Sequence, residues 1–163
     1  MCKRAFMRVE LVDSVPGSRP GIRAFVAADE SDLGALMYRA YVETVDYEGE
    51  TLEQAVAEVR KTICGEYGEF VPTCSKVGVR AGNLMCATLI TRFQERPFVA
   101  FTFTDPAVTR QGLARECMQA AMAELYAQGE RELRLVVTLA NTPAIKLYTR
   151  LGFQLEQSRS CTR

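Results

Sequence analysis

Hydrophobic positions along the chain follow two spacings, one typical of helices and one typical of strands. Apolar residues at helical spacing predict amphipathic helices over residues 33–45, 52–63, 112–128 and 143–151. Short apolar runs bounded by turn residues predict strands over residues 21–27, 76–80, 84–91, 98–104, 133–139 and 153–157. The middle three strands follow one another without a helix, so they predict an antiparallel meander. The strand over 133–139 follows a helix and completes a crossover.

Polar residues and glycines mark the ends of several helices. Thr51 and Gln54 form a capping box before the second helix. Gly129 follows the third helix, as is common at helix C-termini. Thr142 stands before Pro143, a residue suited to the first helical position. We therefore expect Thr142 to cap the last helix.

The length of the chain and its apolar content predict one domain with a short N-terminal lead. A chain of 163 residues with 48% hydrophobic residues is long enough to bury its own core. Residues 1–19 show little periodicity and end in turn-forming residues, so they predict a loose lead. We expect residues 20–163 to form a single domain.

Charge and hydropathy limit the partners that the chain can have. Twenty acidic and twenty basic residues cancel, so we expect no nucleic-acid or membrane partner. The basic start is not followed by an apolar run, which predicts a cytoplasmic protein with no signal peptide and no membrane span. Residues 29–69 hold eleven acidic residues against three basic ones, a balance that suits a cationic ligand or a solvated helix surface.

The absence of histidine restricts the chemistry. No Ser-His or Cys-His pair is available, so any catalysis must use carboxylates, tyrosine, cysteine, the backbone or water. Six cysteines are scattered without a C-x-x-C pair, so we expect no metal site. Most of them lie on apolar faces and are interpreted as small buried hydrophobes in a reducing compartment.

A strand that leads through a turn into a helix supplies the first candidate site. The first amides of a helix are unpaired and lie at the positive end of its dipole, so they bind phosphate-like anions. Gly112, at the start of this helix, lets an anion approach the backbone closely, and Arg110 and Arg115 flank it. The alternative is that Gly112 only caps or packs the helix, and that the two arginines are solvated charges.

A second motif, Asn141-Thr-Pro-Ala144-Ile-Lys-Leu-Tyr148-Thr-Arg-Leu-Gly152-Phe153, ends the chain's predicted core. Together the two motifs resemble the GNAT superfamily of N-acetyltransferases. In that family, Arg or Gln, two residues, Gly, one residue, then Gly or Ala open the pyrophosphate-binding helix. Gly112, Leu113 and Ala114 match this pattern after Arg110 and Gln111, but Thr109 stands where the family usually has Arg or Gln.

The resemblance implies an α/β (α+β) fold, the acyl-CoA N-acyltransferase fold, with a mixed, mostly antiparallel sheet of six or seven strands and helices on both faces. It implies acetyl-CoA as cosubstrate and no metal. The strand before the loop would carry a bulge and diverge from the strand over 133–139, so that pantetheine fits between them. The implied cofactor-binding residues are Phe103, Thr104, Arg110, Gln111, Gly112, Leu113, Ala114, Arg115 and Asn141. Asn141 is alternatively a turn or cap residue.

By the same resemblance, Tyr148 would be the catalytic acid, although a tyrosine on an apolar helix face is otherwise a packing residue. No base is identified. Glu43, Asp46 and Glu48 follow the first helix, where family members often build the acceptor pocket. The alternatives are that these carboxylates are solvated charges and that water serves as the base.

The function implied is direct transfer of an acetyl group from acetyl-CoA to a primary amine in a ternary complex. The acceptor is a small molecule or a peptide amine, and the acidic balance of residues 29–69 favours a small cationic amine. The alternatives are a non-catalytic acyl-CoA sensor or regulatory module, and a structural or dimerising domain. Homodimers are common in the family.

Overall fold

The computed structural model describes residues 3–14 and 19–156. Its elements, in chain order, are β1 (Arg4–Glu10), β2 (Ile22–Ala24), η1 (Ala27–Asp29), α1 (Glu30–Tyr41), α2 (Leu52–Ile63), β3 (Glu69–Phe70), β4 (Lys76–Arg80), β5 (Asn83–Phe93), β6 (Arg96–Thr104), η2 (Pro106–Val108), α3 (Leu113–Ala127), β7 (Glu132–Thr138), α4 (Thr142–Arg150) and β8 (Gln154–Leu155). Within these described ranges, no helix has both the length and the apolar character needed to cross a membrane.

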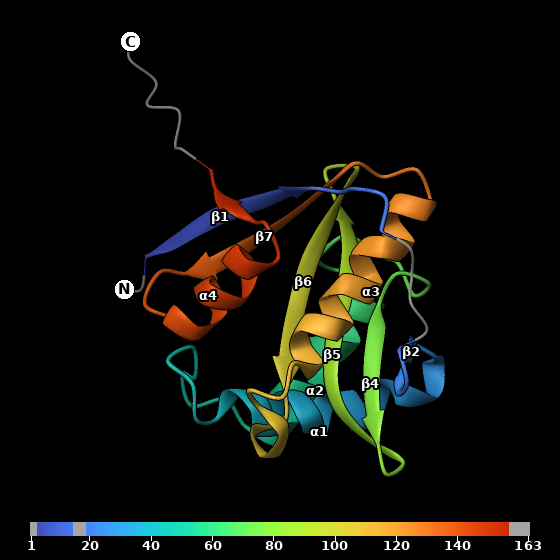
Figure 1. The fold of residues 1–163 in the computed structure, drawn as a ribbon. Coiled ribbons are helices and arrows are strands. Elements are labelled where there is room, and N and C mark those ends of the chain that lie inside the picture. Colours follow the sequence, from blue (N-terminus) through green and yellow to red (C-terminus); the bar gives the residue numbers. More distant parts are fainter. Residues whose placement is uncertain (1–2, 15–18, 157–163) are drawn as a thin grey trace.

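One mixed sheet organises the protein, and the expected fold class is confirmed. Its strand order is β2-β4-β5-β6-β7-β1-β8, with β3 paired to β5 (Figure 1). Every pairing is antiparallel except that of β6 with β7. The sheet has eight strands because β1 and the short β3 join the six that the hydrophobic pattern predicts.

The expectation that residues 1–19 form a loose lead is wrong for Arg4–Glu10. These residues form β1, which pairs along the length of β7, from Arg4 opposite Thr138 to Glu10 opposite Glu132. Met7 and Val9 are buried in the core, whereas Phe6, Arg8 and Glu10 are exposed. This alternation covers only two buried positions, so it is a weak sequence signal. Residues 1–2 and 15–18 of the expected lead, and Gln157 of the expected last strand, lie outside the described residues.

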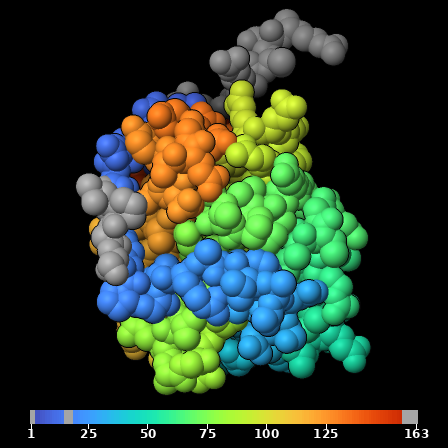
Figure 2. All heavy atoms as spheres, turned by 90° about the vertical axis from the view of Figure 1, so that its right-hand side faces the viewer, coloured from blue at the N-terminus to red at the C-terminus, as the bar shows by residue number. Residues whose placement is uncertain are grey.

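Helices cover both faces of the sheet. One core joins α1 and α2 to the sheet through residues such as Leu36, Val59 and Leu89. A second core joins α3 and α4 to β7 and β1 through residues such as Met118 and Leu135. Figure 1 shows α3 in front of the sheet and α1 and α2 behind it. Figure 2 faces the edge of the sheet that carries β2, where the blue N-terminal residues lie beside the orange residues of α3.

The position of β1 predicts a large cost for truncating its inner side chains. Met7 is 1% exposed, whereas Val12, just beyond β1, is 69% exposed. We expect Met7→Ala to lower the free energy of unfolding by about 2–5 kcal/mol, because it leaves a cavity in the core. Val12→Ala should change it by less than about 0.5 kcal/mol. Urea denaturation measures both, and equal values for the two variants would contradict the place of β1 in the core.

Candidate active site

The sheet opens between β6 and β7. These parallel strands are bridged at Phe98 and Arg134, and no further pair joins them within the described residues. The register of β6 against β5 shifts beside this point, where Phe101 pairs with Leu89 and Val99 with Ile90, so Ala100 is an extra residue in a bulge. Both the bulge and the divergence agree with what the resemblance implies, and the divergence is visible in Figure 1.

The start of α3 carries unpaired amides. Gly112 is the N-cap residue, with φ 79°, and no side chain caps the helix. The first helical hydrogen bond runs from Glu116 N to the Gly112 carbonyl oxygen. The amides of the three intervening residues, Leu113, Ala114 and Arg115, have no hydrogen-bond partner in the described part of the chain. This helix end therefore presents several donors to an anion.

The space above Gly112 is open. A Cβ atom placed on Gly112 would meet no heavy atom within 4 Å. Arg110 also has a left-handed backbone, with φ 65°, and the side chains of Arg110, Gln111 and Arg115 are exposed around the loop. The Thr109 hydroxyl donates to the Pro106 carbonyl oxygen at 3.2 Å, so it stabilises the turn from within. The fold therefore brings the predicted loop residues together around an accessible helix start.

An ion pair that the sequence did not predict stabilises the start of the loop between β6 and α3. Asp105 lies where β6 ends, and its Oδ1 accepts a hydrogen bond from the Ala107 amide at 2.9 Å. Its Oδ2 accepts one from Nε of Arg39, on α1, at 3.0 Å. These contacts, the Ala107 amide first, lower the pKa of Asp105. Arg39 and Asp105 are 66 residues apart, so no local pattern could have indicated the pair.

Tyr148 lies on the inner face of α4 and is 8% exposed. Its ring lies 5.9 Å from that of Phe153, between ring centres. Its hydroxyl forms no hydrogen bond with residues 3–14 or 19–156. Burial, with a smaller contribution from the charge of Asp46, raises the pKa of Tyr148 well above its usual range. The side chain is thus packed by its ring and keeps an unpaired neutral hydroxyl.

Asn141, and not Thr142, is the N-cap of α4. The Asn141 Oδ1 accepts a hydrogen bond from the Ala144 amide at 3.2 Å. The expectation for Thr142 is wrong because the helix begins one residue earlier, with Thr142 itself as its first residue. The Asn141 Nδ2 donates to Oδ2 of Asp46 at 2.8 Å. Both ends of the amide therefore contact the protein itself.

Of the three carboxylates expected near the acceptor, only Asp46 reaches α4. Glu43 and Glu48 are exposed, and within the described chain neither carboxylate makes a hydrogen bond or an ion pair. Tyr41, which no sequence motif singles out, packs beside the split: its ring centre lies 6.2 Å from that of Phe103 on β6. Tyr41 occurs at core spacing in the predicted first helix, a pattern that indicates packing only.

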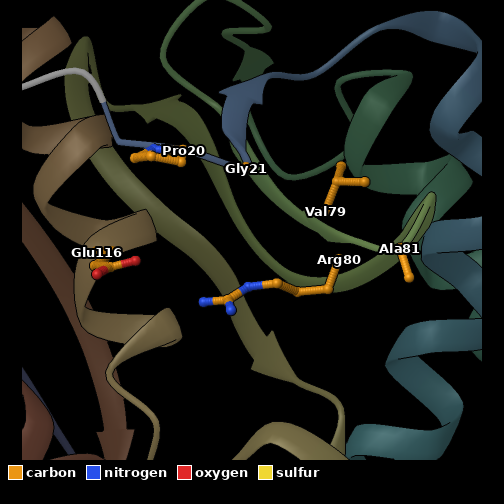
Figure 3. A pocket seen from close by; sticks show the side chains of 6 residues that line it. All are labelled: Pro20, Gly21, Val79, Arg80, Ala81 and Glu116. Carbon is orange, nitrogen blue, oxygen red and sulfur yellow. The ribbon is translucent and has the colours of Figure 1, made fainter.

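A separate pocket of about 450 Å³ lies on the other side of α3. It is lined by Pro20, Gly21, Val79, Arg80, Ala81 and Glu116. In Figure 3, Arg80 extends from β4 toward α3, where Glu116 lies across the opening. None of these residues was predicted as a site residue, and none lies on β6 or β7.

The split sheet and the adjoining helix start define the class of protein. An extended ligand can add backbone hydrogen bonds to the free edge of β6, while its anionic end meets the amides of α3. A sequence model of the acetyltransferase (GNAT) family matches residues 43–153, more than half of the 163 residues. The chain belongs to this family of acetyltransferases.

Solved structures share the fold at low sequence identity. A GCN5-related N-acetyltransferase from Sphaerobacter thermophilus matches with a TM-score of 0.72 and 20% identity, over 94% of this chain and 48% of that one. The PaiA N-acetyltransferase from Thermoplasma acidophilum, in complex with coenzyme A, matches with a TM-score of 0.68 and 15% identity, over 85% and 92%. The ribosomal-protein-S18-alanine N-acetyltransferase from Escherichia coli matches with a TM-score of 0.64 and 20% identity, over 83% and 78%.

This chain therefore spans about half the length of the Sphaerobacter protein. No curated protein sequence matches the chain.

Proposed function

We propose that the protein transfers an acetyl group from acetyl-CoA to a primary amine. The observation that carries this proposal is the row of unpaired amides at Leu113, Ala114 and Arg115, beside the split between β6 and β7. Membership in the acetyltransferase family and the coenzyme A complex of the PaiA protein support it.

The residues around the split fit acetyl-CoA. The open space over Gly112 and the unpaired amides that follow it suit the pyrophosphate, with Arg110, Gln111 and Arg115 around it. Phe103 and Thr104 pair with β5 on one side, and the edge of β6 that faces β7 has no strand partner at their level, so this edge would bind the pantetheine amides. Asn141 would contribute only its second amide hydrogen to a cofactor, because its other groups are engaged.

Tyr148 would hold and move the proton that the leaving sulfur needs. When bound, acetyl-CoA supplies the acetyl thioester, so that a C–N bond forms to the acceptor, the C–S bond breaks and the electron pair leaves on sulfur. A protonated amine loses two protons in this exchange. One reaches sulfur by way of the Tyr148 hydroxyl, which takes its replacement from the amine nitrogen, and the other passes to solvent. The raised pKa of Tyr148 keeps this hydroxyl in the protonated form that a donor requires.

The acidic balance of residues 29–69 supports a small cationic acceptor over a neutral one. The Escherichia coli protein is named for a ribosomal-protein acceptor. Assays with small amines should therefore include a peptide amine for comparison.

Placing a carboxylate above α3 tests the cofactor site. We expect Gly112→Glu to weaken acetyl-CoA binding at least about tenfold, because it fills the open space with bulk and negative charge. Gly129→Glu is the matched control. Gly129 ends the same helix, also has positive φ, at 95°, and also faces open space, so it carries the same backbone strain. Calorimetric titration measures both affinities, and equal binding by the two variants would contradict the site.

Removing the Tyr148 hydroxyl tests catalysis. We expect Tyr148→Phe to lower kcat about 10²-fold with unchanged acetyl-CoA affinity, the effect typical of a lost acid. Because the pKa of Tyr148 is raised, wild-type kcat should show no decrease from Tyr148 ionisation between about pH 6 and pH 9. Thiol release with a panel of primary amines measures both. Unchanged turnover by the variant would rule out Tyr148 as the acid, and acetyl-CoA binding without turnover of any amine would favour the acyl-CoA sensor.

A further inference from the structure

Asp46 is the carboxylate that the fold brings to α4. It lies in the connection between α1 and α2, which passes beneath the start of α4 in Figure 1. The hydrogen bond from the Asn141 Nδ2 occupies one carboxylate oxygen, Oδ2. The other oxygen, Oδ1, has no hydrogen bond within the described residues. Asp46 is therefore fixed in place and keeps one free acceptor.

The Tyr148 hydroxyl is carried toward this carboxylate by helix geometry. Tyr148 follows Asn141 by seven residues, or two helical turns, so both lie on one face of α4 about 10.5 Å apart along the axis. Side chains on a helix lean toward its N-terminus, which brings the Tyr148 hydroxyl back toward Asn141 and Asp46. The charge of Asp46 raises the pKa of Tyr148, in agreement with this proximity.

Tyr41 approaches the same place from α1. Its ring contacts Phe103 beside the split, and its hydroxyl makes no hydrogen bond within the described chain. Burial raises the pKa of Tyr41, with smaller contributions from Tyr148 and Asp46. Each of the three groups therefore lies within electrostatic reach of the others. Three elements, α1, the connection after it and α4, converge here.

Both tyrosine hydroxyls remain accessible to a ligand. Neither makes a hydrogen bond within the described residues, and neither is a fully enclosed unpaired polar atom, a state found in the described chain at Thr91 Oγ1. The free Asp46 oxygen and the two tyrosine oxygens are three acceptors around one negative charge. A primary ammonium group has three N–H donors and one positive charge. A tertiary ammonium has the same charge but a single donor.

The acidic residues around Asp46 favour a ligand that carries a second positive charge besides the primary ammonium. Residues 42–51 contain Glu43, Asp46, Glu48 and Glu50 and no basic residue. A second cationic group a few bonds away from the first would meet the exposed carboxylates of Glu43 and Glu48.

We propose that Tyr41, Asp46 and Tyr148 bind the primary ammonium of a small aliphatic amine that carries a further positive charge, and that Asn141 is a positioning residue for Asp46. This inference rests on the proposed acetyl transfer, because it assigns the acceptor of that reaction. It differs from the role that the resemblance implies for Asn141, which is a contact with the cofactor.

Binding to the protein saturated with coenzyme A tests the inference without turnover. Calorimetry with 1,5-diaminopentane should show binding, and N,N,N′,N′-tetramethyl-1,5-diaminopentane should bind at least about tenfold more weakly, because two of three donors are lost at each nitrogen. We expect Asp46→Asn to weaken diamine binding at least about tenfold and Tyr41→Phe to weaken it about threefold to tenfold. Asp32→Asn is the matched control: Asp32 is exposed at the far end of α1, and this variant should bind the diamine as wild type does.

Asn141→Ser separates positioning from helix capping. Serine is also a good N-cap residue, so the free energy of unfolding should stay near that of wild type, whereas serine is too short to hold Asp46. Diamine affinity should therefore decrease, and an unchanged affinity would overturn the positioning role. Equal binding of the two diamines, equal binding by Asp46→Asn, or no diamine binding to protein that does bind coenzyme A would overturn the inference while leaving the proposed function intact. Failure to bind coenzyme A would instead remove the proposed function.

Discussion

The parallel pairing of β6 with β7 holds at Phe98 and Arg134 and then ends, and the rest of the site depends on this interruption. A continuous sheet would satisfy the inner edge of β6 with backbone from β7. Because the strands diverge, that edge stays available between the two helical layers. The bulge at Ala100 changes the direction of β6 at the point where the pairing stops. The opening is thus built into the backbone and does not require a particular side chain.

Contacts on either side hold this opening in shape. On the edge away from β6, β7 pairs with β1 over seven residue pairs. The N-terminal strand β1 therefore stabilises β7 where β7 no longer pairs with β6. On the near side, Arg39 of α1 holds Asp105 at the end of β6, and Tyr41 packs on Phe103. Asp46 and Asn141 join the connection after α1 to the start of α4. These contacts link the loop that suits the pyrophosphate to the region where the acceptor is proposed to bind.

Local sequence patterns predicted the positions of helices and their caps, because these depend on residues close together in the chain. Helical spacing and glycine ends placed α3 and α4 to within one or two residues, and the capping box at Thr51 is present, with Gln54 N donating to Thr51 Oγ1. Gly112 was identified because a glycine at a predicted helix start lets an anion approach the backbone and because it matches the family motif. The family and the fold class followed from two motifs that lie close together in the chain.

Contacts between distant residues were beyond these patterns. Strand β1 was missed because its two buried residues gain their stability from β7, more than 120 positions away. The hydrogen bond from Asn141 to Asp46, 95 residues earlier, was likewise not predicted. Neither Tyr41 nor Arg39 differs in sequence from an ordinary helix residue. The resemblance predicted an acceptor pocket near Glu43, Asp46 and Glu48, and the fold distinguishes Asp46 by its hydrogen bond with Asn141.

Amide hydrogen exchange with and without coenzyme A tests the central claim most directly, because the claim concerns backbone donors. Peptides that contain Val99–Thr104 and Gly112–Arg115 should exchange more slowly when coenzyme A is bound, whereas the turn between β4 and β5, near the separate pocket at Arg80, should be unaffected. Protection beside Arg80 with no change at β6 and α3 would contradict the account.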